Sequence, residues 1–245
     1  MKPYEYFSRK SIAMVFRTAF LFVALSIFTI GCSSSSSSDS NAKTDSFLSE
    51  IQGSYIELFP VIGQQKYRNI WIDEIQKIQK DVNDSAANAM AEGIIEMMQA
   101  EIYGEEAIES YDFPNNFAFR CNFILDVAKI KIQGNQISGF AKDGKEIFSH
   151  TYTAVKNSKA EAHVYQSDDE NSGAFAFFGF QDDTPKTTFH LEFRYSDTES
   201  DVGKDAWFSG KLAYWNVGAI QEDYDDELVD KVIRLFVDEN FGEEE

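Results

Sequence analysis

Two side chains that can bind a metal ion, His190 and Glu192, occupy alternate positions of a predicted β-strand. Alternate side chains of a strand point to the same face of its sheet. Asp182 and Asp183 end the preceding predicted strand. An imidazole and up to three carboxylates could therefore meet at the mouth of a barrel and bind a divalent ion, and zinc accepts such a mixture of nitrogen and oxygen ligands.

His190 also has a simpler interpretation. A single histidine among acidic residues is more often a surface residue, or one whose hydrogen bonds are satisfied within the fold, than a metal ligand. The other two histidines, His150 and His163, lie on separate predicted strands and are not expected to bind the ion. The sequence therefore leaves both interpretations of His190 open.

Known catalytic and nucleotide-binding patterns are absent from the sequence. The chain contains no phosphate-binding loop, no dinucleotide-binding fingerprint, and neither the HExxH nor the GxSxG pattern. With three histidines and no plausible cysteine partner for them, a nucleophile and its base are hard to assemble. We therefore expect a binding protein and not an enzyme.

The elements that would position these residues change in character along the chain. Residues 65 to 103 show helical periodicity in two pieces, and Asn83 to Ser85 are predicted to break the first helix and cap the second. From Asn116 onward the period is two. Strands are predicted, in chain order, at residues 116–127, 129–141, 145–155, 161–166, 173–180, 187–196 and 206–217.

Seven or eight antiparallel strands at this spacing favour a closed or nearly closed barrel, because closure removes exposed strand edges. A last helix is predicted near the C-terminus, since its first turn is acidic and one face is apolar. The apolar side chains of that face are Leu228, Val232, Leu235 and Phe236. We expect this helix to pack on the barrel.

The N-terminal residues predict a secreted and lipidated protein. A basic start is followed by the apolar run from Ala19 to Gly31, so residues 1–31 are predicted to be a signal peptide. The Thr29 to Cys32 stretch resembles the lipobox of bacterial lipoproteins, which implies acylation of Cys32. Residues 32–46 are rich in serine and are predicted to be a flexible tether. Acylation leaves Cys121 without a disulfide partner, and it is predicted to be buried.

The charge balance argues against two kinds of direct partner. The whole chain has a formal charge of -19, and removal of the signal peptide takes away four cations and one anion, which leaves about -22. Nucleic acid and anionic membrane surfaces would repel such a protein, so contact with a membrane is expected only through the lipid on Cys32.

Four segments, in the same order along the chain, resemble the ZinT (YodA) family of periplasmic zinc-binding proteins. Ile51 to Pro60 is similar to the opening pattern of that family, and Lys142 to Phe148 is similar to its turn and hydrophobic strand. Thr188 to Phe193 resembles its metal-binding HxH strand. Tyr214-Trp215, followed by the acidic helix, resembles its ending. The likeness covers most of residues 47 to 240.

The resemblance implies a mainly β fold with helices: a lipocalin-like (calycin) antiparallel β-barrel with an N-terminal helical region and a C-terminal helix. One domain would span residues 47–241, followed by an acidic tail at 242–245. The implied function is capture, buffering or delivery of zinc in the cell envelope, with a metal transporter component as a partner. Ser33 after Cys32 resembles outer-membrane sorting, with the protein facing the periplasm.

The departures from the family lie at the metal site. His190 would be the central ligand, with Glu192 where the family has a second histidine and Asp183 or Asp182 where an upstream histidine is expected. Such a site should bind zinc less tightly than three histidines and accept other divalent ions. Two alternatives stay open. One is a surface interaction lipoprotein, and the other is a metal-free barrel that binds a small apolar ligand among Phe175, Phe177, Phe178 and Phe180.

Overall fold

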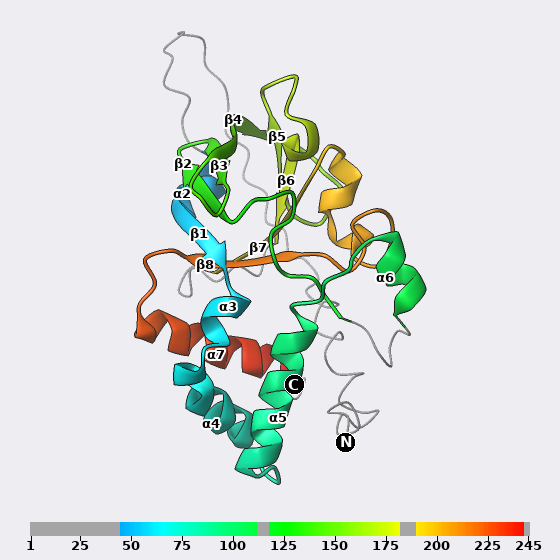
Figure 1. The fold of residues 1–245 in the computed structure, drawn as a ribbon. Coiled ribbons are helices and arrows are strands. Elements are labelled where there is room, and N and C mark those ends of the chain that lie inside the picture. Colours follow the sequence, from blue (N-terminus) through cyan, green and yellow to red (C-terminus); the bar gives the residue numbers. More distant parts are fainter. Residues whose placement is uncertain (1–44, 112–117, 182–189, 243–245) are drawn as a thin grey trace, which may run out of the picture.

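A closed antiparallel barrel is the centre of the computed structural model, which describes residues 45–111, 118–181 and 190–242 (Figure 1). Each strand pairs with the next along the chain, and β1 pairs with β8 to close the barrel. The predicted barrel is therefore confirmed. The strands are β1 Gly53–Glu57, β2 Lys129–Gln133, β3 Gln136–Phe140, β4 Glu146–Ala154, β5 His163–Ser167, β6 Phe177–Phe180, β7 His190–Ser196 and β8 Val217–Gln221.

The interior of the barrel is aromatic. On β7, Leu191, Phe193 and Tyr195 belong to the buried cluster inside the barrel, which we call the barrel core. Neighbouring rings pack against one another, for example Phe178 against Phe193 with centroids 5.9 Å apart. The alternate residues of β7, beginning with His190, consequently lie on its outer face.

A second core lies between the barrel and a layer of helices. The helices are α2 Ser46–Glu50, α3 Phe59–Ile62, α4 Arg68–Ile78, α5 Asp84–Met97, α6 Glu105–Ser110 and α7 Asp226–Phe241. Helices α4, α5 and α7 lie together below the barrel in Figure 1. Their buried side chains form one cluster with α3 and with Ile220 of β8, which we call the helical core.

The two helices predicted between residues 65 and 103 are confirmed as α4 and α5. The break between them is also where the sequence indicates it, because the Asn83 side chain accepts a hydrogen bond of 3.0 Å from the backbone N–H of Ala86 and caps α5. None of the helices in the described part is long and apolar enough to cross a bilayer.

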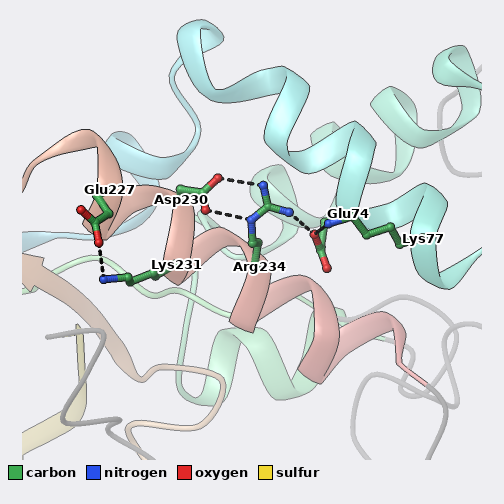
Figure 2. Close-up of polar contacts among 6 residues, drawn as sticks. All are labelled: Glu74, Lys77, Glu227, Asp230, Lys231 and Arg234. Carbon is green, nitrogen blue, oxygen red and sulfur yellow. Dashed lines mark hydrogen bonds and ion pairs between the residues drawn. The ribbon is translucent and has the colours of Figure 1, made fainter.

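Helix α7 is present as predicted, but the face that it buries is shifted by about one residue from the predicted face. Val229, Val232, Ile233 and Val237 are buried, whereas Leu228 and Phe236 are only partly buried against the helical core. Its outer side carries an ion network with α4 (Figure 2). Arg234 binds both carboxylate oxygens of Asp230, at 2.8 and 2.9 Å, and also Glu74 of α4.

The predicted strand at residues 116–127 is wrong for its described part. Residues 118–127 form single bridges at Arg120 and otherwise irregular backbone. The apolar alternation has another cause here: Phe119 and Cys121 pack in the helical core, and Phe123 and Ile124 pack in the barrel core. The segment lies between the two cores, and its apolar side chains are divided between them. It is not a strand with one buried face and one exposed face.

The predicted strand at residues 206–217 is wrong for a similar reason. Its apolar residues are shared between the cores, with Leu212 and Trp215 in the barrel core and Ala213 and Tyr214 in the helical core. Tyr214 has a positive φ of 58°, which extended backbone excludes. The strand β8 begins only at Val217.

Two segments cover the ends of the barrel. Helix α2 lies at the end that carries the β2–β3 turn, where its cap residue Asp45 donates a backbone hydrogen bond of 2.9 Å to Asn135. Leu48 of α2 is fully buried in the barrel core. At the other end, the segment from Asn122 to Val127 lies against Tyr195 and Trp215.

Candidate functional site

His190 is the first residue of β7 and lies on the outer face of the barrel. Its cross-strand partner is Ile220 of β8, which belongs to the helical core. The side chain is only 7% exposed. Burial lowers the pKa of His190 to about 4, so its imidazole is neutral at physiological pH, the form in which histidine binds metal ions.

Glu192 lies on the same face as His190, as the alternation in the sequence predicts. Its side chain is half-buried, and its Oε2 atom accepts a hydrogen bond of 3.2 Å from Nδ2 of Asn216. The backbone carbonyl of Glu192 accepts a hydrogen bond of 2.9 Å from Gln181. The site therefore combines a neutral imidazole with a carboxylate on one rigid strand.

The free thiol of Cys121 lies near this carboxylate. Burial raises the pKa of Cys121, and the negative charge of Glu192 raises it further. Its Sγ atom lies 3.9 Å from the sulfur of Met98. The prediction that Cys121 is a buried residue is confirmed, and its high pKa makes it a poor nucleophile and a poor metal ligand.

The other two predicted ligands, Asp182 and Asp183, lie outside the described residues. They follow Gln181 in the chain, and the backbone of Gln181 pairs with Glu192. Within residues 45–111, 118–181 and 190–242, no three histidine, cysteine, aspartate or glutamate side chains lie close enough to bind one metal ion. A metal site at this place would therefore need a donor beyond those of the described part.

The remaining histidines lie apart from His190, on β4 and β5. Nδ1 of His150 lies 2.7 Å from the carboxylate of Asp169 at the surface. The ring of His163 stacks on Phe47, with centroids 3.9 Å apart. Each of these two histidines has a contact that accounts for its position.

The four phenylalanines proposed to surround an apolar ligand do not line one space. Phe178 and Phe180 are fully buried in the barrel core, and Phe175 packs against it from a short 3-10 helix. Phe177 is on the opposite face of β6 by alternation and is only half-buried. Phe175 stacks on Phe148 with centroids 4.0 Å apart. These contacts are those of a packed core.

Two buried polar residues next to Glu192 escaped the sequence analysis. Arg194 continues the outward alternation of His190 and Glu192, so its position could have been inferred from the strand pattern. Asn216 carries no such signal, because it lies within a segment whose strand prediction is wrong. Arg194 is fully buried, and its Nη1 and Nη2 atoms donate to the backbone carbonyls of Asp201 and Leu212 at 3.1 and 2.9 Å.

Comparisons with known proteins find no matching family model and no similar curated protein. Among solved structures, the Zn(II)-bound ZinT-like domain of Streptococcus pneumoniae AdcA is 14% identical, with a TM-score of 0.45 over 81% of this chain and 94% of that one. Zn(II)-bound AdcA from the same organism has the same identity and TM-score, over 81% of this chain and 37% of the longer protein. A likeness of this size does not establish membership of a family.

Proposed function

We propose that this protein is a lipid-anchored, non-enzymatic binding protein that captures zinc in the bacterial cell envelope. One observation carries the proposal: His190 is buried in a neutral state on the same strand face as Glu192. A neutral imidazole and a carboxylate are both zinc ligands. The resemblance of Thr188 to Phe193 to the metal-binding strand of the ZinT family supports the choice of zinc.

The proposed ligands are His190, Glu192 and Asp183 or Asp182, with water in any open position. Carboxylates are harder ligands than imidazole, so this set should bind zinc less tightly than three histidines and should also accept other divalent ions. Because the imidazole of His190 is neutral at physiological pH, metal binding there need not displace the second proton of an imidazolium. The site would suit capture and release of an ion better than permanent storage.

The proposed location rests on the N-terminal sequence, and residues 1–31 and Cys32 lie outside the described residues. Two or more acyl chains on Cys32 would hold the protein at a membrane, which we propose is the outer membrane on its periplasmic side. Substitution Cys32→Ala should move the protein from the membrane fraction to the soluble fraction of the envelope. A metal transporter component is the proposed partner to which zinc would be delivered.

The test of zinc binding is calorimetric titration of the chain from Ser33 onward, against a competing chelator. We expect a dissociation constant in the micromolar range or tighter, which corresponds to about -8 kcal/mol. Binding should be lost in His190→Ala and retained in the matched control His150→Ala, whose imidazole lies at the surface beside Asp169. Zinc affinity unchanged in His190→Ala would contradict the proposal.

A further inference from the structure

Residues 124–127 form a tight turn at the end of the barrel opposite to α2, which we call the Leu125 turn. The N–H group of Val127 donates to the carbonyl of Ile124 at 3.3 Å, and Leu125 and Asp126 between them have positive φ angles of 56° and 61°. This is the pattern of a type I′ turn, whose central positions favour glycine, asparagine and aspartate. Leucine is unfavourable there, because its Cβ atom crowds the backbone in the left-handed region.

The side chain of Leu125 is displayed to solvent on a rigid support. It is 49% exposed, so burial within this chain offsets little of the backbone strain. The hydroxyl group of Tyr195 holds the turn in place through the backbone of Ile124. Single exposed apolar residues are common, but an exposed leucine that is also held in a left-handed conformation indicates a contact outside the chain.

Two cations lie near the Leu125 turn, although the chain as a whole is acidic. Phe123 precedes the turn, and its N–H group donates to Glu57 at 3.2 Å. Burial raises the pKa of Glu57, and the nearby charges of Arg120 and Lys142 act in the opposite direction. Lys142 is exposed, in the connection between β3 and β4. A surface that receives this turn should therefore combine an apolar hollow with negative charge.

A surface hollow of this kind lies on the same chain, at the start of α7, and we call it the α7 hollow. Its volume is about 270 Å³. Pockets for small molecules usually have volumes of about 300 to 1,000 Å³, so the α7 hollow suits a single side chain better. The apolar part of its lining is Leu228 and Tyr224, and the acidic part is Asp223, Asp225 and Glu227.

We propose that the Leu125 turn of one copy docks in the α7 hollow of a second copy of this chain. The two surfaces cannot meet within one chain. The α7 hollow lies at the α2 end of the barrel, where the N–H group of Glu222 donates to the carbonyl of Ser54 near the start of β1 at 2.7 Å. A contact between two different surfaces is head-to-tail, so it can repeat from copy to copy.

The two surfaces are complementary in charge. The cations near the Leu125 turn would face the carboxylates of the α7 hollow. The turn also carries a carboxylate, that of Asp126, and the hollow also includes a cation, Lys231, whose Nζ atom lies 2.7 Å from Glu227. Opposite charges are therefore available in both directions. The contact uses none of the proposed metal ligands, so it is independent of the proposed function.

The test is sedimentation equilibrium of the chain from Ser33 onward. The contact is small, so we expect a dissociation constant of about 0.1 to 1 mM, and concentrations up to about 1 mM are needed. Salt at about 0.15 M screens the repulsion between two acidic chains beyond about 8 Å. The average mass of the unchanged chain should rise with concentration.

Two variants remove one surface each. Leu125→Gly should fold, because glycine accepts the left-handed conformation, and should weaken association at least about 10-fold. Asp223→Lys should weaken it by a similar factor, because it places a cation in the α7 hollow. The matched control is Ile108→Ala on α6, which removes an apolar side chain of similar exposure and should leave association unchanged. Leu125→Asn is a second variant of the turn, since asparagine also accepts the left-handed region.

A mixture of the two variants tests the head-to-tail arrangement. Leu125→Gly keeps the hollow and Asp223→Lys keeps the turn, so a pair of unlike chains retains one working contact. The mixture should form heterodimers and nothing larger, whereas each variant alone should stay monomeric. The proposal is overturned if the unchanged chain stays monomeric, if the two variants associate as the unchanged chain does, or if their mixture stays monomeric.

Discussion

The hydroxyl group of Tyr195 forms hydrogen bonds with both backbone polar groups of Ile124. It accepts from the N–H group at 2.9 Å and donates to the carbonyl oxygen at 2.8 Å, and both residues are buried. The neighbouring residues are held in the same way, since Trp215 donates to the carbonyl of Asn122 at 2.9 Å. A segment without regular structure can cross the end of the barrel because side chains satisfy its backbone.

Tyr195→Phe should therefore lower the free energy of unfolding by about 1 to 3 kcal/mol. The substitution keeps the ring and removes one oxygen, which leaves the buried N–H group of Ile124 without its partner, whereas the carbonyl oxygen keeps a longer bond of 3.3 Å from the N–H group of Val127. Urea denaturation measures the effect. The control is Tyr152→Phe, whose hydroxyl makes a single backbone bond, to the carbonyl of Phe175 at 2.6 Å. It should cost less, because Phe175 is only partly buried, and equal losses would contradict this account.

Arg194→Met should cost about 1 to 3 kcal/mol in unfolding free energy. The substitution keeps a long apolar stem but removes the guanidinium donors of the Asp201 and Leu212 carbonyls, and only the Leu212 carbonyl keeps another bond, of 3.2 Å from the N–H group of Trp215. Both carbonyls lie in the connection between β7 and β8, so local hydrogen exchange should increase there as well. A loss below about 0.5 kcal/mol would mean that this guanidinium does not hold the connection.

The ion network between α4 and α7 offers the contrasting case. Arg234 contacts Asp230 and Glu74, but it is about a third exposed to solvent. Arg234→Met should cost less than about 1 kcal/mol, because water and salt screen such pairs. Denaturation in low and high salt should show this cost decreasing as salt is added. A cost that does not change with salt would point to lost packing of the arginine stem.

Stability should depend on pH through Asp45. Burial raises the pKa of this carboxyl, but hydrogen bonds from Tyr165, Phe47 and Leu48 outweigh it and hold the pKa below its usual value. The stabilisation is thus present above the unfolded pKa of about 3.9 and is lost as the pH falls through the lower folded value.

Asp45→Asn tests this effect, since asparagine keeps the capping geometry and removes the charge. Above about pH 5 the variant should be less stable by about 0.5 to 1 kcal/mol, the usual contribution of a charge at a helix N-terminus. The difference should shrink below about pH 4. Thermal melting across this range measures it, and a difference that does not vary with pH would contradict the assignment.

Phe178→Ala should create a cavity in the barrel core and cost about 3 to 5 kcal/mol. Phe178 is fully buried, and its ring packs against those of Phe180, Phe193 and Tyr195.

Native mass spectrometry of the unchanged protein should show the mass of the polypeptide without an organic ligand. A bound ligand that survives purification would instead support the small-ligand alternative.

The sequence alone predicted much of the fold, because local patterns encode it. The break at Asn83 was predictable because an asparagine side chain can cap a following helix within three residues. The single strand predicted at residues 129–141 is wrong, because the structure divides it into β2 and β3 at Gly134-Asn135, a dipeptide typical of a tight turn. His190 and Glu192 were placed on one face because alternation along a strand follows from backbone geometry.

Only the tertiary structure decided which face that was and what surrounds it. The same period-two pattern arises in β7, where one face meets the barrel core, and in residues 118–127, where the side chains are divided between two cores. Periodicity reports that alternate residues are buried, but not what buries them. The contact of Asn216 with Glu192 joins residues 24 positions apart, and such a pair is decided by strand register and packing, which no local pattern encodes.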